Sequence, residues 1–345
     1  MPTPMHLASR TEKTRHKLLI VLLWVALLGP ASSGAQIKSN FASSITSESM
    51  TAMWVARDRG LFKKHGLEMQ YVVISRSPLA VAALIAGEID AAIIGPGHLI
   101  SAGSTGADLI GIANLFQKLD YRLNARPEIK KPEDLRGKRI AISGPGSTSH
   151  LVTLLALQGL NIDAAQAKIT LLTIPGTEMN RRLALESGGV DATTLRGAIG
   201  DLYGAKGFHV LYNFKTTGVT LPQTVLATTR RTAATKPQVI DAYLKAMIEA
   251  IAVTVDPANK DGVVRTIATN LRLSNLADAE EAYHAVVSSV ERVPYSNLET
   301  MKRLHRLLIQ VNPKVADVKV ESVIDNSFID KLESSGYIQS VYKKK

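Results

Sequence analysis

Short apolar runs alternate with helical patterns through most of this chain. β-branched and alternating residues predict a first set of strands at residues 36–43, 68–74, 89–94 and 109–116. Apolar residues at helical spacing, bounded by Gly or Pro, predict helices between them at residues 50–60, 79–86 and 98–102. This alternation is typical of an α/β protein with a largely parallel sheet.

A second set of the same kind follows, and a helical region comes after it. The predicted strands of the second set lie at residues 140–142, 168–174, 190–195 and 208–212, and its helices at residues 151–156, 177–187 and 197–205. After a β-rich run at 224–229, apolar stripes predict helices at residues 238–255, 261–270, 277–290, 297–310 and 323–337.

A charged segment at 126–138 separates the two sets. It carries two prolines and no apolar period long enough for a core element. We predict that the chain crosses here from one lobe to another, with a short capped turn at 131–135. A return crossing is expected near Thr224.

Residues 1–35 have the pattern of a secretory signal peptide. Four basic residues precede an eleven-residue apolar run at 18–28, and Ser33-Gly34-Ala35 supplies small residues before the expected cleavage after Ala35. The run is too short to span a bilayer comfortably, although an N-terminal membrane anchor is the alternative. We therefore predict a periplasmic protein.

Composition narrows the class of protein further. The chain has no cysteine, so no disulfide stabilises its fold and no lipid on a cysteine anchors it to a membrane. Removal of residues 1–35 takes away four basic residues and one acidic residue, and lowers the formal charge from +11 to +8. That charge attracts anionic solutes or simply aids solubility. Aromatic residues make up only 5% and do not interleave with basic runs, which argues against nucleic-acid binding.

Two Gly-Pro-Gly turns follow predicted strands. The turn at 144–146 leads into Ser147, Thr148 and Ser149, which can cap the next helix. Free N–H groups and the positive end of the helix dipole favour an anion at such a place. An ordinary capped strand–turn–helix is the alternative. The second turn, at 95–97, raises the question whether the two turns face each other across a cleft.

Four stretches of the chain resemble the substrate-binding proteins of ABC importers. They stand in the family's order, at residues 62–68, 87–92, 129–141 and 236–246, and the resemblance covers about residues 37–260. The nitrate/sulfonate/taurine-type group is the most similar branch. The resemblance implies a periplasmic-binding-protein-like fold of type II, in which two α/β lobes, joined by two crossing strands, close on a ligand by a hinge. It implies one lobe at 36–125 plus 224–345 and a second lobe at 126–223.

Ligands of open α/β sheets collect at the carboxyl ends of strands, and the resemblance places the ligand there too. The candidate binding residues are Ser44, Thr46, Ser47, Gly95, Pro96, Gly97, His98, Gly144, Gly146, Ser147, Thr148, Ser149, Thr194 and Arg196. Arg196 is the expected charge partner of an anion, with a solvated surface arginine as the alternative. His98 is more often a surface residue at a helix start. Glu48 would repel an anion, so it either caps its own helix or binds an amine on a mixed ligand.

The sequence favours a binding protein over an enzyme. Some relatives that the resemblance implies do chemistry, and they include desulfinases and a pyrimidine-forming branch that depend on cysteine, which this chain lacks. No Gly-x-Ser-x-Gly, His-Glu-x-x-His or Walker motif is present. We expect a monomeric receptor without cofactor or metal that captures a small organic anion, a carboxylate or sulfonate, and delivers it to an ABC permease in the inner membrane. A periplasmic sensor with the same cleft is the alternative, and an enzyme is a weaker one.

Overall fold

The computed structural model describes residue 1 and residues 36–74, 76–175 and 178–343. The predicted signal peptide, apart from Met1, lies outside the described residues. The chain divides into two units, Met1–Ile37 and Lys38–Lys345, and the second holds the elements described here, apart from the first residue of β1. Within the described part of the chain, no helix combines the length and apolar character needed to cross a membrane.

The first sheet has five strands in the order β2–β1–β3–β10–β4. The strands are β1 (Ile37–Ser43), β2 (Leu67–Val73), β3 (Ala91–Ile94), β4 (Leu109–Lys118) and β10 (Thr220–Thr229). β1 and β3 are parallel, whereas β10 runs antiparallel to both β3 and β4. The sheet is therefore mixed rather than largely parallel, because a strand that returns from elsewhere is inserted beside β3.

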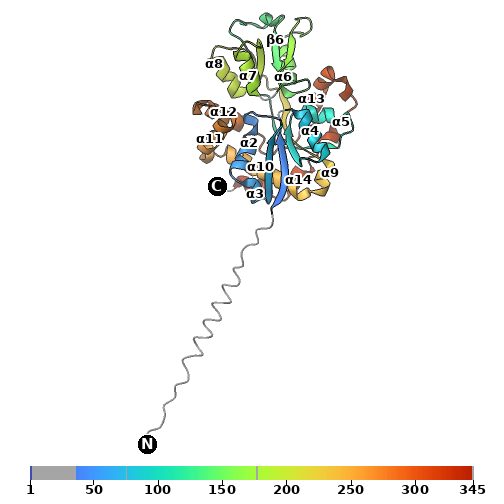
Figure 1. Cartoon of the computed structure of the whole chain (residues 1–345), viewed down its shortest axis with the longest axis vertical. Coiled ribbons are helices and arrows are strands. Elements are labelled where there is room, and N and C mark those ends of the chain that lie inside the picture. The colour runs from blue at the N-terminus through green and yellow to red at the C-terminus, as the bar shows by residue number, and fades with distance from the viewer. Residues whose placement is uncertain (2–35, 75, 176–177, 344–345) are drawn as a thin grey trace. The chain divides into compact units, whose positions relative to one another are not determined.

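The second sheet repeats this arrangement in the order β7–β6–β8–β5–β9. The strands are β5 (Tyr121–Ala125), β6 (Arg139–Ile142), β7 (Thr170–Thr173), β8 (Ala192–Arg196) and β9 (His209–Asn213). β6 is parallel to β7 and β8, and β5 is antiparallel to β8 and β9. Figure 1 shows α6, α7 and α8 gathered around β6 of this sheet.

The two crossings lie nearer the N-terminus than the sequence predicted. The chain leaves the first sheet after β4 and enters the second at Tyr121, and it returns between β9 and β10. The charged segment at 126–138 therefore does not cross between sheets, because it joins β5 to β6 within the second sheet. The predicted capped turn in it is present as the short helix η2 (Pro132–Leu135).

Helices cover both sheets. They are α2 (Thr51–Asp58), α3 (Leu61–Lys64), α4 (Ser77–Ala86), α5 (Pro96–Gly103), α6 (Thr148–Gly159), α7 (Glu178–Glu186), α8 (Gly197–Ala205), α9 (Arg230–Thr235), α10 (Pro237–Val255), α11 (Lys260–Leu271), α12 (Leu276–Ser289), α13 (Leu298–Val311), α14 (Ser327–Ser334) and α15 (Tyr337–Lys343). Short 3-10 turns are η1 (Glu48–Met50), η3 (Phe214–Thr216), η4 (Pro257–Asn259), η5 (Pro313–Val315) and η6 (Val320–Val323). The helices predicted from the sequence include neither α3 nor α9.

Local chemistry explains where several helices begin and end. Pro occupies the first turn of α4, α5 and α10, where its missing N–H costs no intrahelical hydrogen bond. Gly87 ends α4 in the left-handed conformation, with φ of 78°. Ser147 caps α6, because its Oγ accepts a hydrogen bond from the backbone N–H of His150.

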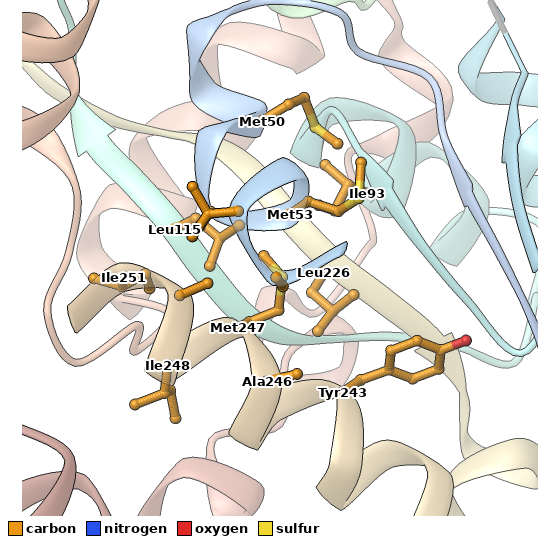
Figure 2. Packing of buried hydrophobic residues seen from close by; sticks show 14 of the residues in the cluster. Met50, Met53, Ile93, Leu115, Leu226, Tyr243, Ala246, Met247, Ile248 and Ile251 are labelled. Carbon is orange, nitrogen blue, oxygen red and sulfur yellow. The ribbon is translucent and has the colours of Figure 1, made fainter. Parts of the chain in front are cut away.

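The largest hydrophobic cluster lies between the first sheet and α2 and α10. Figure 2 shows Met53 and Met247 from these helices packed toward Ile93 and Leu226 of the sheet. A second cluster includes buried residues of both sheets, such as Ile94 and Leu123, so packing continues from one sheet to the other. This packing holds the carboxyl ends of the strands in a defined place.

Candidate ligand-binding cleft

A cavity of about 360 Å³ lies between loops of the two sheets. It is bounded by the loop after β1, the start of α5 after β3, the loop between β6 and α6, the last residue of β8, and part of β10. These are mostly the carboxyl ends of parallel strands, as expected for ligand sites of α/β sheets. Loops 44–47, 95–98 and 144–149 thus meet at one place, although they lie far apart in the sequence.

Most of the predicted binding residues lie in the cavity wall. These are Ser44, Thr46, Ser47, Gly95, His98, Gly144, Ser147, Thr148, Ser149 and Arg196. Pro96, Gly97, Gly146 and Thr194 are not in the wall. Thr194 is fully buried, and its hydroxyl donates to the carbonyl of Ser149 at 3.4 Å, so its role is to support the loop. Contact between the wall residues and a ligand stays a prediction.

The N-terminus of α6 forms one wall of the cavity. Ser149 Oγ accepts a hydrogen bond from the Ser143 N–H at 2.8 Å, and Ser147 Oγ lies 3.1 Å from it. His150 Nδ1 accepts from the Gly146 N–H at 2.9 Å, which requires a neutral acceptor nitrogen. Burial lowers the pKa of His150, which favours this neutral form. His150 therefore shapes the turn, and the helix dipole presents its positive end to the cavity.

Arg196 lies at the end of β8 with its side chain buried. Its Nη2 donates to Gln223 Oε1 at 2.7 Å, and its guanidinium carbon lies 5.4 Å from the Phe116 ring centroid and 5.2 Å from that of Tyr121. Burial opposes the charge, but Tyr121 and Glu48 outweigh it, and the pKa of Arg196 is raised. The alternative of a solvated surface arginine is wrong, because only 5% of this residue is exposed.

A second guanidinium, that of Arg181 on α7, also lines the cavity and escaped sequence analysis. Its Nη1 donates to Ser143 Oγ at 2.5 Å, and its Nη2 lies 3.8 Å from Glu178 Oε2. Its Nε is buried and has no hydrogen-bond partner among the described residues. Burial lowers the pKa of Arg181, with partial compensation by Glu178. Two buried arginines, together with the exposed Arg76, thus share the wall with a single carboxylate, that of Glu178.

The two Gly-Pro-Gly turns approach each other closely beside the cavity. A Cβ atom at Gly97 would lie 2.5 Å from the Gly146 carbonyl oxygen, and one at Gly95 would lie 3.2 Å from Thr148 Oγ1. Gly97 is therefore required for close approach of the backbones, rather than for an unusual φ. The turn at 95–97 follows a strand of the first sheet and the turn at 144–146 follows a strand of the second, so the two turns face each other beside the cavity.

His98 adds a neutral polar group to the wall. Burial lowers its pKa to about 4, so the imidazole carries no charge at neutral pH. His98 is only partly exposed and lies in the cavity wall. The sequence had favoured a surface position for it at the start of a helix. No cluster of three or more His, Asp or Glu side chains among the described residues is arranged to hold a metal ion.

Two similar mixed sheets, two crossings and a cavity between their loops define the two-lobed fold of periplasmic binding proteins. The alkanesulfonate-binding protein SsuA of Xanthomonas axonopodis, bound to MOPS, superposes with a TM-score of 0.69 at 19% identity, over 86% of this chain and 100% of that one. The nitrate-binding protein NrtA of Synechocystis gives a TM-score of 0.66 at 11% identity, over 90% and 91%.

The chain belongs to the NMT1/THI5 like family, whose family model matches residues 47–259. Among curated relatives, a Brucella abortus protein named as a binding protein is 33% identical over 114 residues, which is 32% of this chain and 35% of that protein. The match thus spans about a third of the length of this relative. The family resemblance predicted from the four sequence motifs is confirmed.

Proposed function

We propose that this protein is the periplasmic substrate-binding protein of an ABC importer and that it captures a small organic anion. The observation that carries the proposal is the pair of buried guanidiniums, Arg181 and Arg196, beside the N-terminus of α6. A buried charge is stable only when it is paired, and these two have fewer partners than donors. An anion in the cavity would supply the missing partner.

The chemistry of the wall favours a carboxylate or sulfonate over a bare inorganic ion. Hydroxyls of Ser147 and Thr148 and the Arg196 fork suit planar or tetrahedral oxyanions. Tyr121, Ile45 and Pro145 add apolar surface, and a cavity of about 360 Å³ has room for an organic group. The alkanesulfonate-binding protein of Xanthomonas axonopodis takes a ligand of this kind, whereas the Synechocystis protein binds nitrate, an inorganic oxyanion.

Release and delivery follow from the fold. The cavity wall comes from both sheets, so separation of the lobes about the two crossings would open it. We propose that ligand binding favours the closed form, which then docks on a membrane permease. Secretion through residues 1–35 would bring the mature chain to the periplasm, where we expect it to act as a monomer.

A thermal-unfolding screen tests this function. A ligand that binds only the folded state stabilises it by about 2.7 kcal/mol at a concentration of 100 Kd. The mature chain should be stabilised by at least one organic sulfonate or carboxylate, and chloride at the same ionic strength should have no effect. The proposal fails if no small anion raises the unfolding temperature, and conversion of an added solute to a new product would indicate an enzyme instead.

A further inference from the structure

A second cavity, of about 520 Å³, adjoins the first. The two share Thr46, Ser47 and Glu178 in their walls. Aromatic side chains of Trp54 and Tyr71 line the second cavity away from this junction. The two cavities are therefore neighbours, separated by no more than these shared residues.

Glu48 lies in the wall of the second cavity, and although the charge of Arg196 acts on it, it forms no direct ion pair with a described residue. It is 3% exposed, and its Oε2 makes no hydrogen bond to any described residue. No Lys, Arg or His nitrogen of the described chain lies within 4.0 Å of its carboxylate, since none of the ion pairs found includes it. A buried carboxylate oxygen without a partner is costly and rare in a folded protein.

Buried Asp90 and partly buried Glu249 of the same molecule both have hydrogen-bond and charge partners. Asp90 accepts from Lys236 Nζ at 2.6 Å and from Ser39 Oγ at 2.7 Å. Glu249 accepts from Lys64 Nζ at 2.6 Å and from Tyr337 Oη at 2.8 Å. Glu48 thus differs from these acids, because its Oε2 has no partner among the described residues. It also lies in the wall of a cavity.

Glu178 brings a second carboxylate to the junction. Its side chain is 10% exposed, and its nearest ion-pair partner is Arg181 at 3.8 Å. Burial first, and then the charge of Glu178, raise the pKa of Glu48 to about 7, although Arg196 opposes the shift. A cation between the two carboxylates would compensate both the burial of Glu48 and its repulsion by Glu178.

The arginines that line the second cavity do not fill this role. Arg57 pairs with Asp58 at 2.8 Å and donates to Asn270, and Arg182 donates to Met179 Sδ at 2.7 Å. A third arginine, Arg272, also lines this cavity, and none of the three forms an ion pair with Glu48 among the described residues. The acidic groups of the two cavities therefore gather at their junction, whereas each wall holds one buried guanidinium nitrogen without a partner among the described residues, Arg181 Nε in the first and Arg182 Nε in the second.

Building on the proposed function, we propose that the ligand is a zwitterion. Its anionic group lies with Arg181 and Arg196 in the first cavity, and a protonated nitrogen lies at the junction, where Glu48 and Glu178 accept its hydrogen bonds. Charge-assisted hydrogen bonds to a protonated nitrogen are among the stronger ones in proteins. A site with a buried polar group also rejects an analogue that leaves it unpaired.

Matched ligand pairs test the proposal on the wild-type protein. Ethane-, propane- and butanesulfonate and the corresponding carboxylates are titrated calorimetrically at about pH 7 beside their terminal-amino counterparts, whose aliphatic amines are protonated at this pH. For at least one pair the amino compound should bind about tenfold or more tightly, as expected for one paired charge. Equal or weaker binding of every amino compound overturns the zwitterion proposal, even if the plain anions bind well.

The variant Glu48→Gln isolates the carboxylate. It should cut the preference for the amino compound by about tenfold or more and leave the plain anion bound as tightly as before or more tightly. Glu281→Gln, an exposed change on α12, is the matched control and should keep the preference. An undiminished preference in Glu48→Gln contradicts the assignment. Failure of both compounds of every pair to bind the wild-type protein refutes the proposed function as well.

Discussion

Buried arginines lie in two regions of the second sheet and its helices, and they differ in the number of carboxylates that pair with them. Arg122 on β5 is 1% exposed, and its Nε and Nη2 donate to Asp201 at 2.7 and 2.8 Å. Its Nη1 donates to Asp120 at 2.7 Å. In the cleft, Arg196 has one hydrogen bond to neutral Gln223 and two ring faces, and the Nε of Arg181 has no partner among the described residues.

The difference distinguishes an arginine that stabilises the fold from the two arginines that we propose bind a ligand. Arg122 is neutralised by two carboxylates of its own chain, as a structural ion cluster requires. Arg181 and Arg196 lie where two sheets and a helix N-terminus meet, and only Glu178 of the first cavity's wall is an acid. The incomplete pairing of the cleft arginines is the physical sign of a binding site.

The largest expected effect is on stability, at Arg122. Arg122→Gln leaves Asp120 and Asp201 without their buried partner, and breaking such a cluster costs about 3–5 kcal/mol of unfolding free energy. Urea unfolding measures this loss. The anion affinity of the folded fraction should stay within about twofold of wild type, since Arg122 does not line the cavity. A large loss of affinity at unchanged stability would remove the distinction between the two regions.

The next effect is the pH dependence of stability due to Glu48. Its pKa is about 7 in the folded protein and 4.5 in the unfolded chain, so the folded state binds more protons between these values. Its contribution therefore becomes unfavourable as the pH rises from 4.5 to 7, by about 3 kcal/mol in total. Glu48→Gln should become more stable than wild type, by a margin that grows across this range.

The difference between the two unfolding curves isolates Glu48 from the histidines. Burial lowers the pKa of His98 to about 4, so this group destabilises the protein as the pH falls below 6.5, which is the opposite trend. Both proteins share this term, and subtraction of their unfolding free energies removes it. A difference that stays constant with pH would show that Glu48 is ionised normally in the folded state.

A smaller effect is expected on affinity at Arg196. Arg196→Gln removes a buried guanidinium from the cavity wall and should weaken anion binding at least tenfold, or about 1.4 kcal/mol. Calorimetry with the best anion of the screen measures it. Arg126→Gln, a partly exposed arginine outside the cavity wall that pairs with Glu128, serves as control. Unchanged affinity in Arg196→Gln would remove this residue from the site.

The smallest effect concerns the contact between the two glycine turns. Gly97→Ala places a Cβ against the Gly146 carbonyl, so the turns must separate by a few tenths of an ångström or more. We expect anion affinity to fall about threefold to tenfold. In Gly262→Ala the new Cβ lies 3.3 Å from the flexible end of Arg59, far from the cavity wall, and affinity should not change. Equal affinity in both variants would show that the turns need not touch.

Local patterns in the sequence were enough to find the loops of the cleft. Loops 44–47, 95–98 and 144–149 each follow an apolar strand and precede a helix, and strand ends are where α/β sheets bind ligands. Arg196 could be named because it follows the strand that became β8. The paired Gly-Pro-Gly turns were also visible, although only the structure shows how closely Gly97 approaches Gly146.

Other parts of the site depend on packing that a sequence does not show. Arg181 lies within the amphipathic helix α7, where a charged residue is normally solvated. Tyr121 and Gln223 were missed because the crossings were placed too late in the chain. Strand periodicity does not reveal which sheet a strand joins, so β5 could not be assigned from its residues alone.

The most direct test of the account is a titration of the best anion of the screen into wild type and into the double variant Arg181→Gln/Arg196→Gln. We expect a saturable, one-to-one binding isotherm for wild type and no measurable heat of binding for the double variant. Both proteins should show the same far-ultraviolet circular dichroism. An isotherm in the folded double variant that matches wild type would contradict the claim that these two buried arginines bind the ligand.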